Sequence, residues 1–305
     1  MRVGLQLHQE RGIDAVLEEA KSADRQGFST VWLFDHLSNP FGGDVADGPF
    51  DSFTLMTAVG ALTSRTRLAW AMLNLSFRRP AVLAKMLTTL DHITKGRVIC
   101  SVGAGWFKKE YEAYDVPLVD DHDERVAYAR EIVRFLKEVW THPAPEAIDF
   151  EGQFVHAKDL AFNPAPYRKP YPPIWIGGES EATLATVKEF ADGWVMLTSG
   201  TKDRLAEVIS APDWPDRPMD LVRNVQLHVA PTRREALEEA AAALGEGRAN
   251  YASLDDYVER EVVGAPDECL ARLKEIESWG ITEVRVTCLD VAQQERIASM
   301  ILPRL

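Results

Sequence analysis

The sequence predicts an α/β protein whose eight parallel strands close into a (β/α)8 TIM barrel. Short apolar runs, rich in β-branched residues, recur eight times along the 305 residues, and segments with helical spacing separate them. The runs are nearly continuous in hydrophobicity rather than alternating, which is typical of parallel strands covered by helices. Eight strand–helix units imply that the sheet closes on itself.

The predicted strands follow one another along the whole chain. They lie at Val3–Leu7, Val31–Phe34, Leu68–Leu73, Val98–Val102, Ile174–Ile176, Trp194–Leu197, Val225–Val229 and Val284–Cys288. Apolar faces at helical spacing fill the intervals, for example within residues 13–23 and 126–139. Pro80 and Pro266 suit the first position of a helix, and Gly280 suits a helix C-cap.

One long interval interrupts this alternation. The segment of about residues 142–173, before the fifth strand, is rich in proline and aromatic residues. Loops of this length in a compact domain usually have a function or carry elements of their own. We expect a hairpin at Ile148–Asp159, inserted over one barrel end, within a single domain that spans residues 1–305.

The composition limits the partners of the chain. Its formal net charge of −13 argues against nucleic acid or an anionic membrane, because phosphate binding needs a basic surface. We therefore expect a small-molecule substrate, with a homodimer as one candidate assembly. The three cysteines are odd in number and far apart, and no signal-peptide pattern opens the chain, so reduced thiols in the cytoplasm are expected.

In a barrel the chemistry lies at the C-terminal ends of the strands, so the residues just after each apolar run are the candidates. Polar or glycine-rich segments follow five of the strands: Asp35-His36, Asn74, Gly103-Ala104-Gly105, Gly177-Gly178-Glu179-Ser180 and Thr198-Ser199-Gly200. Glycine lets backbone N–H groups approach a ligand, and a helix N-terminus favours an anion. The turns at Gly103 and Gly177 are therefore either phosphate-binding turns or simply tight strand-to-helix turns.

Asp35 and His36 place a carboxylate and an imidazole together at a strand end. Histidine is the usual group for proton transfer near neutral pH, so both residues are candidates for catalysis. The alternative is a helix-capping aspartate beside a packed histidine. Asp121-His122-Asp123 precedes a long predicted helix, where acidic capping residues are expected, and no metal site is predicted.

Several segments resemble the luciferase-like monooxygenase superfamily and, within it, the branch that uses the deazaflavin coenzyme F420. They are VWLFDH at Val31–His36, SFRRPAVLAKMLTTLDHITKGRV at Ser76–Val98, SVGAGWFKKEY at Ser101–Tyr111, PPIWIGG at Pro172–Gly178, ADGW at Ala191–Trp194 and GAPDECLARLKEIESWGITEV at Gly264–Val284. The resemblance covers nearly the whole chain in order. It implies a barrel that holds F420 or FMN over the strand ends.

The resemblance also implies roles for individual residues. Those near the flavin ring would be Asp35, His36 as proton donor or acceptor, and a non-prolyl cis peptide at Ala71-Met72. Residues along the ring edge and side chain would be Asn74, Gly103, Ala104, Gly105 and Trp106, and those at the phosphate would be Gly177, Gly178 and Glu179. F420-dependent sugar-phosphate dehydrogenases carry a glutamate where this chain has Trp106, which argues against that activity.

The leading prediction is an F420-dependent oxidoreductase that transfers a hydride between the deazaflavin and a C=C, C=N or C=O group. Four basic residues near the predicted mouth would favour the polyglutamate tail of F420: Arg78, Arg79, Lys108 and Lys109. The first alternative is an FMN-dependent monooxygenase. More distant alternatives are a serine hydrolase, suggested by Ser180 at a strand-to-helix turn, and a flavin-binding protein without catalysis.

Overall fold

The computed structural model describes residues 1–40, 48–142, 146–196, 201–245, 251–288 and 290–305. Its main sheet contains β1 (Arg2–Gln6), β2 (Thr30–Leu33), β3 (Arg67–Trp70), β4 (Leu73–Asn74), β5 (Cys100–Gly103), β8 (Ile174–Gly177), β9 (Gly193–Met196), β10 (Asp220–Val229) and β12 (Glu283–Thr287). The strands pair in parallel in the order β3-β2-β1-β12-β10-β9-β8-β5-β4, and β11 (Val262–Gly264) pairs in parallel with the C-terminal end of β10. A bridge between Leu68 and Val98 joins the two ends of this order. The predicted barrel is therefore confirmed.

Six of the predicted strands agree with observed strands to within two residues, apart from Leu197, which lies outside the described residues. The third divides into β3 and β4 at the Ala71–Met72 peptide, which is cis as the resemblance implied. The seventh is the second half of a ten-residue strand, β10.

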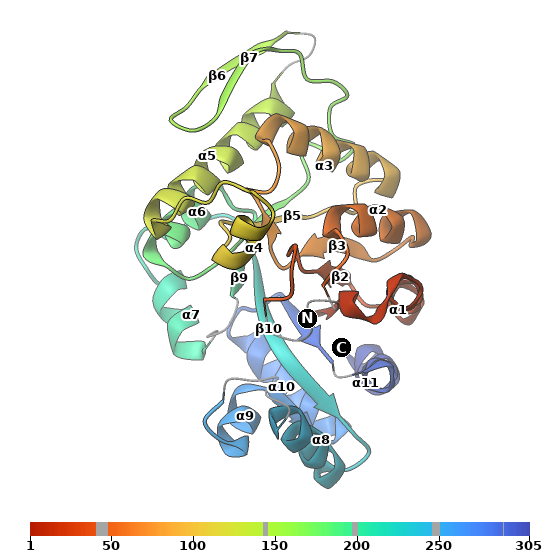
Figure 1. The fold of residues 1–305 in the computed structure, drawn as a ribbon. Coiled ribbons are helices and arrows are strands. Elements are labelled where there is room, and N and C mark those ends of the chain that lie inside the picture. Colours follow the sequence, from red (N-terminus) through yellow and green to blue (C-terminus); the bar gives the residue numbers. More distant parts are fainter. Residues whose placement is uncertain (41–47, 143–145, 197–200, 246–250, 289) are drawn as a thin grey trace.

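Helices alternate with the strands and form the outer layer (Figure 1). They are α1 (Ile13–Gln26), α2 (Ser52–Leu62), α3 (Pro80–Thr94), α4 (Lys108–Ala113), α5 (His122–Thr141), α6 (Glu181–Phe190), α7 (Lys202–Ile209), α8 (Arg233–Gly245), α9 (Leu254–Arg260), α10 (Pro266–Ser278) and α11 (Val291–Arg296). Pro80 and Pro266 open their helices as expected, and Gly280 takes φ +100° just after the C-cap of α10. Within the described ranges, no helix is both long enough and apolar enough to cross a bilayer.

The inserted segment forms the expected hairpin, with β6 (Ile148–Glu151) antiparallel to β7 (His156–Leu160). It packs beside α5 rather than over a barrel end, because the Phe150 ring meets Phe135 at 5.0 Å. The Glu131 carboxylate of α5 accepts hydrogen bonds from the backbone N–H groups of residues 153–155 in the hairpin turn. Figure 1 shows the hairpin projecting beyond α5.

The barrel interior is a packed core rather than a pore. Trp32 and Trp175 pack inside it with ring centroids 5.7 Å apart, among small and branched side chains of the other strands. Glu283 lies below them, fully buried, and pairs with Arg2 and Arg67. Because this interior is filled, ligands are expected at the C-terminal ends of the strands.

Asp24 gives the fold a pH-dependent contact. Its carboxylate, at the end of α1, accepts backbone N–H bonds from Ser64 at 3.1 Å and from Arg65 and Thr66 at 2.8 Å, which fixes the start of β3. Burial alone would raise the pKa of Asp24, but these hydrogen bonds together lower it below its ordinary value.

We expect Asp24→Asn to destabilise the protein by about 1–3 kcal/mol at neutral pH, because part of this acceptor set is lost. A folded-state pKa below the unfolded value gives stability that is present above about pH 4 and is lost as the pH falls through the folded pKa. Urea unfolding at neutral pH and near pH ~3 should therefore show the difference shrinking in acid. A difference that stays constant would contradict this account.

Candidate active site

Most of the predicted site residues gather at one end of the barrel. Asp35 and His36 directly follow β2, Asn74 ends β4, Gly103 ends β5 and Gly177 ends β8. Because parallel strands end at the same side of a sheet, these positions share the barrel mouth, a name used here for the residues that follow β2, β4, β5 and β8. The segment Thr198-Ser199-Gly200 lies outside the described residues.

His36 is held in the mouth by a buried carboxylate. Its Nδ1 lies 2.9 Å from Oε1 of Glu110, and the other oxygen of Glu110 accepts the backbone N–H of Leu37 at 2.8 Å. Glu110 belongs to α4 and is fully buried. An ionised carboxylate only accepts, so Nδ1 carries the ring proton and Nε2 is the basic nitrogen of the neutral imidazole. The arrangement suits proton transfer at Nε2.

Sequence reasoning missed Glu110. It lies 74 residues from His36, within a short helix rather than directly after a strand, so neither spacing nor position linked the two. The only available signal was its place inside the SVGAGWFKKEY segment of the resemblance.

The carboxylate of Asp35 accepts hydrogen bonds from three other residues of the protein. Arg78 donates to both carboxylate oxygens, at 2.6 and 3.0 Å, Ser52 donates at 2.6 Å and the backbone N–H of Asn74 donates at 2.8 Å. Burial alone would lower the pKa of Arg78, but Asp35 and the nearby Asp51 raise it above its usual value. These contacts suit a positioning role for Asp35 better than the predicted catalytic one.

Asn74 and Gly105 fix the turn after β5. Asn74 is buried and shares two hydrogen bonds with the Tyr111 hydroxyl, at 2.7 and 2.9 Å. Gly105 has φ +78°, and a Cβ there would overlap the Tyr111 hydroxyl. Glycine is therefore required both by the backbone and by the space. The turn Gly103–Trp106 rests on this pair.

Met72 accounts for two glycines that were predicted to meet the cofactor. A Cβ on Gly177 would lie 2.6 Å from both Cγ and Sδ of Met72, and one on Gly103 would lie 3.0 Å from its Cβ. Gly103 and Gly177 therefore leave room for the Met72 side chain, which lies across the ends of β5 and β8. No phosphate is needed to explain them, and phosphate contact by Gly177 stays a prediction.

We expect Gly177→Val to destabilise the protein by about 1–3 kcal/mol, because it overpacks the space that Met72 fills. Met72→Ala in the same chain should restore much of that stability. Thermal unfolding of the single and double variants tests this. A Gly177→Val protein as stable as the wild type would show that the Met72 side chain moves freely.

The turn after β8 joins two helix N-termini. Ser180 caps α6 by accepting the N–H of Thr183 at 3.2 Å, and its hydroxyl lies 3.1 Å from Nε2 of His122 in the first turn of α5. Asp121 caps α5 as predicted. No carboxylate of the described residues bonds to His122, so the geometry does not support a serine hydrolase. Two adjacent helix N-termini instead favour an anion.

Gly178 and Glu179 complete this turn. Gly178 has φ +128°, and its carbonyl accepts from the indole N–H of Trp194 at 2.8 Å. The carbonyl of Glu179 accepts from Arg204 of α7 at 3.3 Å. Both residues therefore lie beside Ser180, as the sequence order requires, and their predicted contact with a phosphate stays a prediction.

Trp106 gives the mouth an exposed aromatic surface. Its side chain is 58% exposed and lies beside His36, with ring centroids 5.8 Å apart. The ring of Phe107 lies 5.4 Å from Trp106 and 6.4 Å from His36. A large exposed indole next to a glycine turn suits a planar aromatic ligand.

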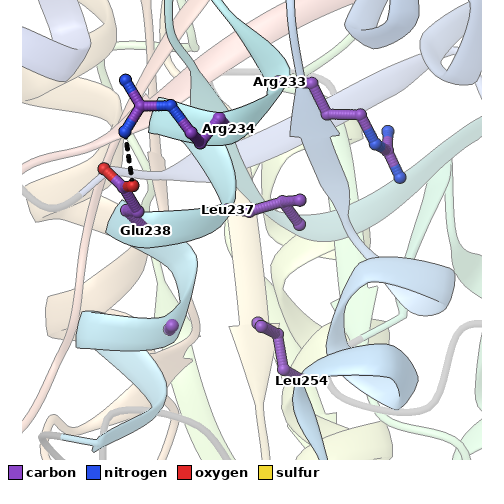
Figure 2. A pocket seen from close by; sticks show the side chains of 6 residues that line it. Arg233, Arg234, Leu237, Glu238 and Leu254 are labelled. Atoms are coloured by element: carbon purple, nitrogen blue, oxygen red, sulfur yellow. Dashed lines mark hydrogen bonds and ion pairs between the residues drawn. The ribbon is translucent and has the colours of Figure 1, made fainter.

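A separate surface pocket of about 460 Å³ lies between α8 and α9 (Figure 2). Leu237 and Leu254 face it from the two helices, and Arg234 and Glu238 form an ion pair at 2.8 Å at its side. Both partners of this pair are well exposed. None of the predicted site residues lines the pocket, so it is separate from the barrel mouth.

Comparison with known proteins identifies the family. The sequence profile of the luciferase-like monooxygenases matches residues 1–283. The chain belongs to this family. An FMNH(2)-dependent dimethylsulfone monooxygenase of Pseudomonas putida is 33% identical over 180 residues, which are 59% of this chain and 47% of the relative. An F420-dependent glucose-6-phosphate dehydrogenase of Mycobacterium avium is 27% identical over 297 residues, 88% of this chain and 86% of the relative.

The solved structures agree on the fold. The monooxygenase RslO1 of Streptomyces bottropensis has a TM-score of 0.79 at 22% identity, with 99% of each chain covered. By contrast, the chain spans about half the length of the first curated relatives it matches. The luciferase-like family is thus established by the sequence profile, and relatives that use FMN and relatives that use F420 are both present.

Proposed function

We propose that this luciferase-like protein is a flavin-dependent oxidoreductase that uses reduced FMN as a monooxygenase. The observation that carries the assignment as an oxidoreductase is the His36–Glu110 pair, held at the mouth beside the Gly103–Trp106 turn. The choice of FMN is supported by the pairing of the basic residues and by one relative. A reduced flavin would supply the electrons, so that one atom of dioxygen enters the substrate and the other leaves as water. The predicted cofactor, F420, becomes the second candidate.

The residues present fit a flavin. The exposed indole of Trp106 and the Met72 side chain offer surfaces for its ring, and the turn on Asn74 and Gly105 borders them. The adjacent N-termini of α5 and α6, with Ser180 between them, would hold its phosphate.

Charge favours FMN over F420. The tail of F420 carries several carboxylates, whereas FMN carries one phosphate. Two of the four basic residues expected to receive that tail are already paired: Arg78 with Asp35, and Lys108 with Asp120 at 2.9 Å. The mouth therefore offers less positive charge than the sequence suggested. The 33% sequence identity with an FMNH(2)-dependent monooxygenase over 180 residues supports the same choice of cofactor.

The second candidate is an F420-dependent oxidoreductase, the activity first predicted. The observation in its favour is that the F420-dependent glucose-6-phosphate dehydrogenase aligns with 88% of this chain. Hydride transfer would use the same mouth and the same His36.

The chain's own residues would move the proton and exclude water. Nε2 of His36 would take or give a proton at the reacting group of the substrate. Glu110 would hold the imidazole in one tautomer and stabilise its protonated form. Trp106 and Phe107, whose rings lie beside the His36 imidazole, would limit the access of water to that imidazole.

Labelled dioxygen tests the monooxygenase proposal. The protein is supplied with reduced FMN and incubated under isotopically labelled dioxygen with a panel of candidate substrates. The panel includes dimethyl sulfone, the substrate named for one relative. We expect a product with one labelled oxygen and no product without dioxygen. Product formed anaerobically with reduced F420, and none with FMN in air, would overturn the proposal in favour of the second candidate.

A further inference from the structure

Arg285 is buried inside the barrel. It lies on β12 in register with Gly4 of β1 and Asn224 of β10, and only 5% of it is exposed. Its guanidinium carbon lies 5.9 Å from the ring centroids of both Trp32 and Phe34. Phe34 directly follows β2, two residues before His36, so the guanidinium lies toward the same end of the barrel as the mouth.

This guanidinium has few partners. Its one hydrogen bond runs from a terminal nitrogen to Oε1 of Gln6 at 3.1 Å, and its Nε has no partner among the described residues. No described carboxylate forms an ion pair with it. Across the strand pair, Oδ1 of Asn224 is also buried without a partner among those residues. The site thus holds an excess of donors on Arg285 and an unused acceptor on Asn224.

Two partly buried arginines among the described residues are each compensated by a buried carboxylate. Arg78 pairs with Asp35, and Arg67 pairs with Glu283 at the lower end of the barrel. A buried charge with only one neutral acceptor is costly, and such groups are normally paired. Burial lowers the pKa of Arg285 to about 10, so the side chain remains a cation at neutral pH. Among the described residues, this cation therefore lacks an anionic partner.

We propose that Arg285 binds a carboxylate of the substrate. The substrate class is then a small organic acid whose apolar part lies against Phe34 and whose reacting part lies toward His36. This inference rests on the proposed function, because it names the substrate class of the same mouth. A carboxylate would supply the two acceptors that the planar guanidinium lacks.

Carboxylate–amide pairs test this assignment. Benzoate and benzamide, and hexanoate and hexanamide, are titrated into the FMN-loaded protein and followed by the flavin absorbance. We expect at least one acid to bind about tenfold more tightly than its amide. Arg285→Met should remove that preference while the FMN affinity stays unchanged.

Stability separates a binding role from a structural one. Replacing a weakly paired buried charge by an apolar side chain of similar size should leave the melting temperature of Arg285→Met equal to that of the wild type or higher. Arg67→Met is the matched control, because it removes one of the two arginines that pair with the buried Glu283 and should lower the melting temperature.

Three results would overturn the assignment. They are an absence of acid preference in the wild type, a preference that survives Arg285→Met, and a loss of stability in Arg285→Met as large as that in Arg67→Met. The same titrations on flavin-free protein, followed by tryptophan fluorescence, keep the two proposals apart. An acid preference there, together with failure to bind FMN, would contradict the proposed cofactor and leave the Arg285 site standing.

Discussion

His36→Ala is expected to lower turnover about a hundredfold or more, the typical contribution of a positioned proton-transfer group. The imidazole stands at the mouth, and Glu110 fixes its tautomer from a fully buried position. Because His36→Ala leaves the buried Glu110 carboxylate without its imidazole partner, some loss of melting temperature is expected, and the rates are compared at a temperature where both proteins are folded. The affinity for FMN should change far less than the rate. Steady-state kinetics across pH, with FMN supplied in its reduced form, measures the effect.

Two further variants separate the roles. His36→Asn keeps a hydrogen-bonding group that cannot titrate, so it should be nearly as slow as His36→Ala if proton transfer matters. Glu110→Gln keeps the size of the side chain but removes the charge that fixes the proton on Nδ1, so the rate should fall, though less than in His36→Ala. Near-normal rates of His36→Ala at every pH, with chemistry limiting, would assign the proton to another group or to water.

Asp35→Ala is expected to destabilise the protein by about 3–5 kcal/mol, because it leaves the guanidinium of Arg78 in place without its main partner. The same change removes the acceptor for Ser52 and for the backbone N–H of Asn74, which links β2 to α2 and β4. Denaturant unfolding at neutral pH measures the loss.

Asp51 provides a matched control. It also pairs with Arg78, at 3.2 Å, but its side chain is 48% exposed. An exposed ion pair contributes little to stability, so the main loss in Asp51→Ala is that of the helix cap, because the carboxylate also caps α2. We therefore expect Asp51→Ala to lower the free energy of unfolding by only about 1 kcal/mol. Adding Arg78→Met to Asp35→Ala should recover part of the loss, because the unpaired cation is removed. Equal losses in Asp35→Ala and Asp51→Ala would show that the burial of the Asp35 pair has little effect.

The barrel could be predicted because its strands are locally marked. Continuous apolar runs such as Val31–Phe34 have few alternatives to a buried parallel strand, and Pro80 and Pro266 fix two helix starts. The full extent of β10 was not predictable, since its first half, Asp220–Asn224, mixes charged and apolar side chains. Which side chains of this half of β10 are buried depends on β9 and β12, the neighbouring strands in the closed sheet.

The sequence predicts where the site lies, but not which hydrogen-bond and ion-pair partners its residues have. Strand-end reasoning found His36 and Asp35, yet whether a carboxylate faces a ligand or a buried arginine depends on residues far away in the chain. The resemblance implies that Gly177 contacts a phosphate. The sequence does not show that the Met72 side chain fills the space beside this glycine. Arg285 stands in β12 between two valines, where nothing local shows that its side chain is buried without a carboxylate partner among the described residues.

The most direct test of the central claim is a side-by-side titration of the purified protein with FMN and with F420 under the same conditions. Flavin absorbance and fluorescence report both dissociation constants. We expect FMN to bind at least about tenfold more tightly, because Arg78 and Lys108 are already paired with carboxylates, which leaves less positive charge for a polyglutamate tail. F420 binding at least about tenfold more tightly than FMN would contradict the monooxygenase proposal and assign the protein to the F420-dependent oxidoreductases.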